Sequence, residues 1–193
     1  MALKNKKVRL IEENYDKYKI ILEGIKNAPI SPIKVSDRKE NHRSSLYKSL
    51  DITHNNVSDK ITLRIEIREN NSDFSISIDS SCFPSCQLLR YDSGDGTHRN
   101  NFSEIPLGEQ SVPTPHFHRY NDEGYSFAYK TDKLKNEKES EALSNIEFGF
   151  SYFCQESNIK YNNINIPTIF IQPDGVLNFS YDDSDPLENI NFA

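Results

Sequence analysis

The sequence predicts an α+β domain in which an antiparallel sheet of about five to six strands packs with an N-terminal helix and a helix in the C-terminal half. Three observations predict this class. An amphipathic segment opens the chain, short segments of alternating apolar and polar residues occupy its middle, and a second amphipathic segment follows them. Helix, sheet and helix in this order favour helices packed on an antiparallel sheet.

The 193 residues of the chain suit a single domain, 1–193. The first predicted element is a helix over residues 5–26. Apolar side chains recur in the helix at steps of three and four residues, and prolines at 29 and 32 end the pattern. Residues 27–60 are rich in Ser, Asn, Asp, Pro and charge, which predicts a long loop with room for one short helix. The apolar stripe of the helix consists of Val8, Ile11, Tyr15, Tyr18, Leu22 and Ile25.

The middle of the chain, residues 61–131, carries most of the predicted sheet and a histidine motif. In residues 61–67 apolar and polar side chains alternate without a break, which indicates a strand with one buried face. Residues 74–78 alternate in the same way after a short polar turn, so the two segments predict a hairpin. Further strands are predicted over residues 86–91, 116–120, 125–130 and 166–172.

A second helix is predicted over residues 138–157 from its apolar stripe at helical spacing. The last residues, 180–193, are acidic and are expected to form a mobile tail whose charge would suit a basic partner surface. The apolar stripe of the second helix consists of Ala142, Leu143, Ile146, Phe150, Phe153 and Cys154. The acidic residues of the tail are Asp182, Asp183, Asp185 and Glu188.

Composition limits the function classes. The net charge is −6, which disfavours a protein whose main task is to bind a nucleic-acid backbone. Nucleic acid could be a partner only through a local basic patch. The odd number of cysteines, Cys82, Cys86 and Cys154, indicates a reduced intracellular protein. We find no apolar stretch of signal-peptide or membrane-span length, so the expected location is cytoplasmic, without membrane contact.

Two histidines, His116 and His118, are the sharpest chemical feature. Residues two apart in a strand share a face and lie about 6.5–7 Å apart along the chain, so both imidazoles can converge on one ion or substrate. His98, in a glycine-containing loop, is the candidate third partner. Tyr120 shares the face of the pair and is a further candidate catalytic residue, whereas Arg119 is expected on the opposite face.

These histidines allow three roles. His98, His116 and His118 could together bind one divalent transition metal, with zinc the first choice and iron or nickel as alternatives. Two of the imidazoles could instead act as general acid and base without a metal, because an unperturbed imidazole titrates near neutrality. In the third interpretation the histidines hydrogen-bond to the backbone and only hold the sheet and loops together.

Five short stretches, in this order, also carry a resemblance to known sequences: HRNN (98–101), PHFHRY (115–120), FAY (127–129), FSYFCQESNI (150–159) and IP (166–167). They resemble an uncharacterised family of small bacterial and phage proteins with a His-x-Asn(-Pro) element followed by Pro-His-x-His-x-Tyr. The likeness covers about residues 86–172, and Asn101 stands where the family has proline. The resemblance implies a bacterial or phage setting on mobile elements, with no established chemistry.

Two functions are therefore predicted. The first is an accessory protein that acts through protein–protein interaction in an antiviral defence, anti-defence or toxin–antitoxin setting, with a protein partner that presents a basic surface. The second is a hydrolase or nuclease, either metal-dependent or using histidine acid–base catalysis, centred on His98, His116 and His118.

Overall fold

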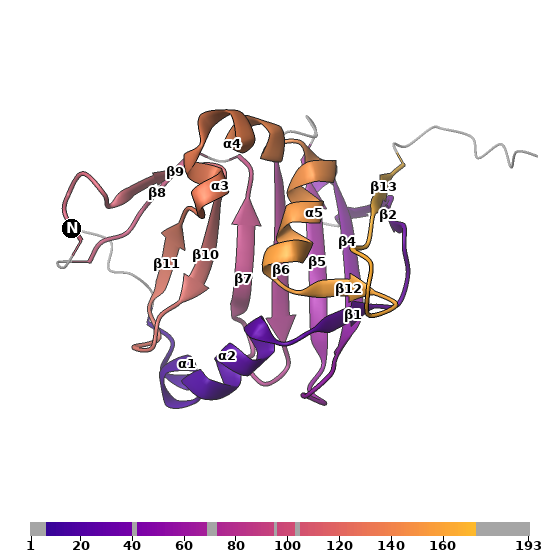
Figure 1. Cartoon of the computed structure of the whole chain (residues 1–193), viewed down its shortest axis with the longest axis horizontal. Helices are drawn as coiled ribbons and strands as arrows, with labels where there is room; N and C mark the ends of the chain where they lie inside the picture. Colours follow the sequence, from indigo (N-terminus) through magenta and orange to yellow (C-terminus); the bar gives the residue numbers. More distant parts are fainter. Residues whose placement is uncertain (1–6, 40–41, 69–72, 95, 103–104, 173–193) are drawn as a thin grey trace, which may run out of the picture.

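The computed structural model describes residues 7–39, 42–68, 73–94, 96–102 and 105–172. It confirms the α+β class and shows a larger sheet than expected (Figure 1). Nine strands form this sheet instead of about five to six, and it is mixed, because β1 and β12 run parallel while the other strand pairs are antiparallel. In the part of the chain described here, no helix is both long and apolar enough to cross a membrane.

Eight strands form the main path of the sheet, and β3 (Asp37–Lys39) joins it by pairing with β4. Two further pairs lie outside it, a parallel pair of β2 (Ile33–Val35) with β13 (Ile169–Ile171) and an antiparallel pair of β8 (Thr97–Arg99) with β9 (Ser111–Pro113). In spatial order the main path is β11 (Ser126–Tyr129), β10 (His116–Tyr120), β7 (Gln87–Asp92), β6 (Phe74–Ser80), β5 (Ile61–Ile67), β4 (His42–His54), β1 (Lys26–Ala28) and β12 (Ile159–Tyr161).

The expected loop over residues 27–60 is wrong, because it contains β4, a strand of 13 residues, together with three short strands. Polar residues interrupt β4, so its alternation is weak in the sequence. Its pairing with β5 places Leu50 against Leu63 and Ile52 against Ile61, and this packing across strands compensates for the weak local pattern.

Each predicted helix is two helices. Asn14, with φ −128° and ψ 34°, separates α1 (Arg9–Glu13) from α2 (Tyr15–Glu23) within the expected helix 5–26. The expected helix 138–157 is α4 (Glu137–Leu143) followed by α5 (Ile146–Glu156). Asn145 divides them, because its side-chain oxygen accepts from the Glu147 amide at 2.9 Å and caps the new helix. A one-turn helix, α3 (Asp132–Lys135), precedes them.

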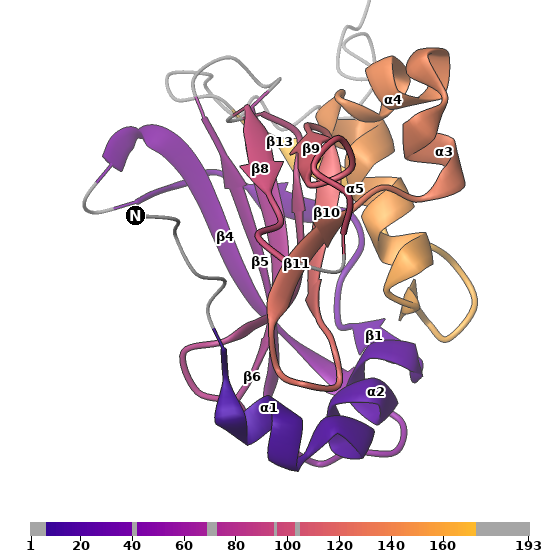
Figure 2. The same ribbon diagram turned by 90° about the vertical axis from the view of Figure 1, so that its left-hand side faces the viewer.

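The two faces of the sheet differ in their cover. Helices α3, α4 and α5 lie on one side of it, while no described helix covers the other side (Figure 2). On the covered face, Tyr91 and Phe117 oppose each other across β7 and β10, and the Phe117 ring stacks on Phe153 of α5 at 6.2 Å between ring centroids.

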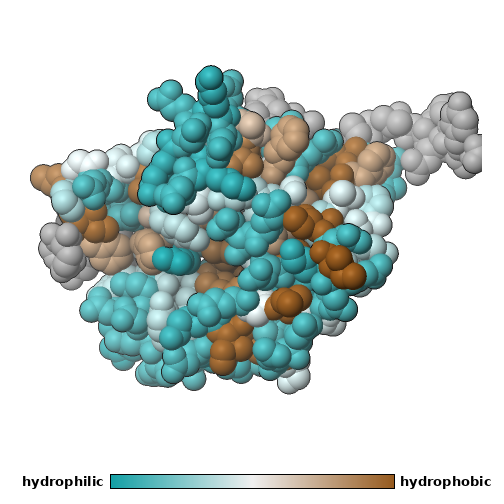
Figure 3. Space-filling model, viewed as in Figure 1, coloured by the Kyte–Doolittle hydropathy of each residue, from teal (hydrophilic) through white to brown (hydrophobic). Residues whose placement is uncertain are grey.

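The outer surface on this side is mostly hydrophilic, with separate apolar groups (Figure 3). Such isolated groups are ordinary on protein surfaces.

The uncovered face carries rows of polar side chains. Residues that oppose each other in an antiparallel sheet project from the same face. One row therefore runs from Glu66 through Ser75 and Asp92 to His116. The next row runs from Arg64 through Ser77 and Arg90 to His118. These two rows bring together polar and charged side chains from four strands, β5, β6, β7 and β10.

Candidate metal centre

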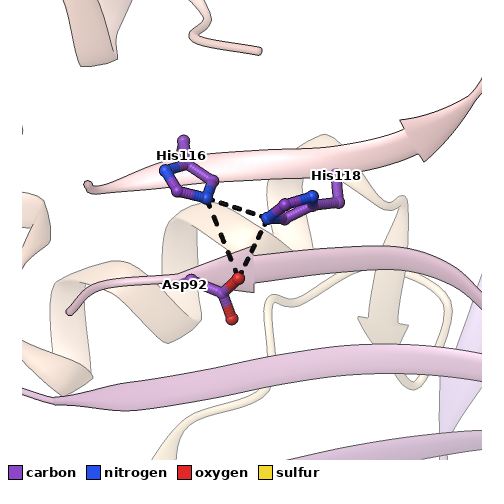
Figure 4. A group of neighbouring side chains, drawn as sticks. All are labelled: Asp92, His116 and His118. Atoms are coloured by element: carbon purple, nitrogen blue, oxygen red, sulfur yellow. Dashed lines mark hydrogen bonds and ion pairs between the residues drawn. The ribbon is translucent and has the colours of Figure 1, made fainter. Parts of the chain in front are cut away.

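Three side chains at one end of these rows point toward one another: Asp92 from β7, and His116 and His118 from β10 (Figure 4). The register places His116 directly opposite Asp92, so the carboxylate and the two imidazoles share the uncovered face. His116 is 3% exposed and His118 is 7% exposed, although both line a polar cavity of about 300 Å³. The group is therefore packed on most sides and reached from the cavity.

The three ligand atoms lie close enough together to reach a single ion, although only one of their three separations falls in the ideal range for ligands of one metal. His116 Nε2 lies 2.8 Å from His118 Nε2, and Asp92 Oδ2 lies 3.1 Å from His118 Nε2 and 3.9 Å from His116 Nε2. Ligand atoms about 2.1 Å from a metal lie about 3.0–3.4 Å apart in octahedral or tetrahedral geometry. Two nitrogens and one carboxylate oxygen form a donor set that zinc and other divalent transition metals accept in proteins.

The hydrogen bonds within the group cannot all form at once. His118 Nε2 lies 3.0 Å from Arg90 Nη2, which can only donate, and 3.1 Å from Asp92 Oδ2, which accepts when ionised. One ring nitrogen has either an N–H or a lone pair, so it cannot serve both neighbours. A buried histidine elsewhere, His54, shows the contrast: its Nδ1 accepts from the Asn56 amide while its Nε2 donates to the Ile20 carbonyl. One neutral tautomer makes both contacts of His54, whereas no protonation state of His118 Nε2 makes both of its contacts with Arg90 and Asp92.

Neighbouring groups hold the Asp92 carboxylate in place. The Ser75 hydroxyl donates to Oδ1 at 2.8 Å, and the Arg90 guanidinium donates to Oδ2 through Nε at 2.8 Å. Arg90 also donates to the Gln87 side chain at 3.1 Å. These contacts orient the oxygen that faces the two imidazoles, which is the role of outer-shell partners at metal sites.

Burial and charge give His116 and Asp92 the protonation states that a metal requires. Burial, with the neighbouring His118, lowers the pKa of His116 to about 4, although Asp92 and the Pro113 carbonyl act in the opposite direction. Burial raises the pKa of Asp92, but the His118 hydrogen bond and the Arg90 charge outweigh it and leave this pKa below its ordinary value. Near pH 7 His116 is therefore neutral and Asp92 ionised, as metal ligands must be.

The third histidine of the sequence hypothesis lies beside this group. The His98 ring, on β8, is 4.7 Å from the His118 ring and 6.2 Å from the His116 ring, between centroids. Its Nε2 is buried and has no hydrogen-bond partner among the described residues. Burial, followed by the charges of His118 and Arg90, lowers the pKa of His98. The atoms that lie within 4.8 Å of one another belong to Asp92, His116 and His118, and do not include His98.

The side chain of Asn100 holds β8, and with it His98, beside His116 and His118. Its side-chain amide donates to the Ala128 carbonyl at 2.8 Å and accepts from the Ala128 amide at 2.8 Å. Ala128 lies on β11 directly opposite His118, so Asn100 ties β8 to the sheet beside the imidazole pair. The His-x-Asn spacing in the sequence thus places an anchor two residues after His98.

Other candidates lie elsewhere. Tyr120 is packed against Tyr18, with ring centroids 6.0 Å apart, and has no recorded contact with the histidines among the described residues. Arg119 lies on the opposite face, as expected, and stacks over Tyr129 at 4.6 Å from the ring centroid. The acidic residues of the tail, 180–193, lie outside the described residues.

Asp92 and Arg90 are the residues that sequence analysis missed. Both belong to β7, where they alternate with apolar residues at the end of the strand, and this alternation is a weak signal for a polar face. Nothing in the local sequence shows which strand β10 pairs with, so the sequence could not connect these two residues with His116 and His118.

Comparisons with known proteins add no assignment. No family model matches the chain, and neither the curated proteins nor the solved structures give a match. The resemblance of residues 86–172 to small bacterial and phage proteins therefore remains a prediction, and the candidate function depends on the geometry of the site.

Proposed function

We propose that this protein is a metal-dependent hydrolase in which Asp92, His116 and His118 hold one divalent transition metal, most simply zinc. The observation that carries the proposal is the convergence of Asp92 Oδ2 with the Nε2 atoms of His116 and His118. The two Nε2 atoms lie 2.8 Å apart, and Oδ2 lies 3.1 Å from His118 Nε2 and 3.9 Å from His116 Nε2. Three protein ligands leave at least one coordination position open, which is the pattern of catalytic zinc sites. A zinc ion in such a site lowers the pKa of the water that it binds to about 7.

The residues around the ligands support hydrolysis as well as binding. His98 lies beside the ligand set with a buried Nε2 that has no protein partner among the described residues. A neutral imidazole in this position accepts or donates a proton during the reaction. Arg90, 2.8 Å from Asp92 Oδ2, supplies a fixed positive charge where negative charge develops.

Metal content and hydrolysis, measured on the same preparations, test the proposal. Purified untagged protein is incubated with zinc, iron, nickel or manganese, desalted and analysed for bound metal. The wild type is expected to retain near one equivalent, and the His116→Ala/His118→Ala double variant is expected to retain none. Asp92→Asn preserves the shape of the side chain and is expected to weaken the affinity by more than the roughly 10- to 100-fold loss typical of outer-shell changes, because it removes the charge of a direct ligand.

His54→Ala is the matched control, because it removes a buried histidine that has no place in the site. This variant is expected to melt at a lower temperature and still bind metal. If the wild type binds none of the four metals, or if the double variant binds as much as the wild type, the metal centre is wrong. A histidine cluster that only supports the fold would instead lose about 1–3 kcal/mol of stability without any change in metal content.

A further inference from the structure

The uncovered face of the sheet holds a second cavity next to the candidate metal centre. This cavity has a volume of about 440 Å³ and is lined by residues that include Lys60, Thr62 and Arg64. Gln87 lines both this cavity and the cavity of about 300 Å³ that contains the histidines. The two cavities therefore adjoin, and their volumes lie in the range of small-ligand sites, about 300–1,000 Å³.

Two arginines line this surface on either side of a small serine. The register places Arg64 opposite Ser77 and Ser77 opposite Arg90, so the three residues occupy neighbouring strands. With strands about 4.8 Å apart, the two arginine backbones lie about 10 Å from each other. Gln87 joins the row, because it accepts from Arg90 Nη1 at 3.1 Å and donates to the Ser77 hydroxyl at 3.4 Å.

Each guanidinium is held by other side chains. Arg64 pairs through Nε with Asp79 and donates from Nη1 to the Tyr47 hydroxyl at 3.2 Å. Arg90 is held by Asp92 and Gln87. The Arg64 side chain remains 48% exposed and the Arg90 side chain 34% exposed, so both stay accessible from the cavities. Arginines held in this way lose little side-chain entropy when they bind a ligand.

The lining of the two cavities has more cationic than anionic side chains, although the net charge of the chain is −6. Four cationic side chains line them, Lys60, Arg64, Arg68 and Arg90, against three anionic ones, Glu66, Asp79 and Asp92, and two of the cations also pair with acids outside the lining, Lys60 with Asp51 and Arg68 with Asp73. A divalent ion bound at Asp92 would add two positive charges to this surface. Such a surface selects an anion, and the planar fork of arginine matches the oxygens of a phosphoryl group.

We propose that the substrate is a small phosphodiester of about dinucleotide size, with Arg90 on the reacting phosphoryl group and Arg64 on the part of the ligand in the second cavity. This inference rests on the proposed function, because it names the substrate of the same site. In the reaction the oxygen of water bonds to phosphorus, and the bond from phosphorus to one ester oxygen breaks. The departing oxygen takes up the proton released by water, which yields an alcohol and a phosphate monoester.

Three chromogenic esters test the substrate class on the zinc-loaded full chain: bis(para-nitrophenyl) phosphate, para-nitrophenyl phosphate and para-nitrophenyl acetate. The phosphodiester is expected to have the highest kcat/KM. Arg64→Gln is expected to raise KM for it about tenfold with kcat within about twofold, since Arg64 binds substrate and does not touch the reacting atoms. Arg90→Gln is expected to lower kcat at least about a hundredfold, the usual effect of removing one group that stabilises developing charge.

Metal affinity separates a catalytic role of Arg90 from a structural one. The guanidinium both orients the Asp92 carboxylate and repels a cation bound there, and these two effects oppose each other, so Arg90→Gln is expected to change zinc affinity less than about tenfold while kcat falls at least about a hundredfold. Arg9→Gln, on the exposed surface of α1, is the matched control and should change neither property. A parallel loss of zinc and activity in Arg90→Gln would overturn the role assigned to Arg90.

The remaining outcomes distinguish the two proposals. If the zinc-loaded protein hydrolyses the acetate or the monoester better than the diester, the phosphodiester inference is wrong and the hydrolase proposal stands. If the protein binds zinc but hydrolyses none of the three esters, the hydrolase proposal fails together with the inference. Unchanged KM in Arg64→Gln, with the diester still preferred, would remove the second cavity from substrate binding.

Discussion

Asn100 offers a direct test of how the fold positions the candidate site. Its side chain is 3% exposed and makes two hydrogen bonds of 2.8 Å to the backbone of Ala128, which is 2% exposed. Asn100→Ala removes both bonds and leaves a buried N–H and a buried C=O without partners. Each unsatisfied buried group costs about 1–3 kcal/mol, so the free energy of unfolding is expected to fall by about 2–5 kcal/mol.

This loss is measurable by urea denaturation and corresponds to a fall in melting temperature of about 5–15 °C for a chain of this size. Amide hydrogen exchange at Ala128 adds a local readout, because the variant loses the acceptor that protects this amide. Asn100→Asp retains the acceptor for the Ala128 amide but places a second oxygen opposite the Ala128 carbonyl. It should therefore be destabilised at least as much as Asn100→Ala, although its shape is almost unchanged.

Asn55→Ala provides the control, because Asn55 is exposed and its side chain bonds, among the described residues, to the half-buried side chain of Asn27. Its effect should stay within about 0.5 kcal/mol. A loss below about 0.5 kcal/mol for Asn100→Ala, with unchanged exchange at Ala128, would refute the argument that Asn100 anchors the strand of His98.

Three further predictions concern other parts of the molecule. Lys26 is fully buried and donates to three carbonyls, of Leu22, Gly24 and Ser157, and burial lowers its pKa to about 7, so the unfolded chain binds more protons between pH 7 and 10.5. The stability of the wild type relative to Lys26→Met should therefore rise with pH across this window, and a flat difference in urea titrations would contradict it. Gly149→Ala would place a Cβ 2.5 Å from the Phe74 ring and 2.6 Å from a carbonyl, so it should lose about 1–3 kcal/mol of stability despite its better helix propensity, and a more stable variant would show that α5 can shift. Deletion of residues 180–193 tests the alternative function as a protein-binding accessory factor: weaker capture of a basic partner in a pull-down is expected if the acidic tail docks, and unchanged capture removes the tail from that hypothesis.

The agreement between sequence and structure is closest where local pattern and tertiary packing favour the same conformation. The strands predicted over 61–67 and 116–120 begin and end at the observed residues. In 61–67 the reason is the alternation of apolar side chains, which meet apolar neighbours across β4 and β6. Strand β4 has no such pattern, and its pairing with neighbouring strands, including seven opposed pairs with β5, makes it a strand. The helix breaks at Asn14 and Asn145 arise from side-chain bonds and backbone angles that helical periodicity does not record.

The sequence by itself determined that His116 and His118 share one face of a strand, since residues two apart in an extended chain always do. It also pointed to His98, through the polar loop and the His-x-Asn spacing. Only the tertiary structure decided which carboxylate and which arginine join them. That choice depends on the pairing of β10 with β7, whose residues are more than twenty positions apart, and such pairings follow from packing of the whole sheet, not from local propensity.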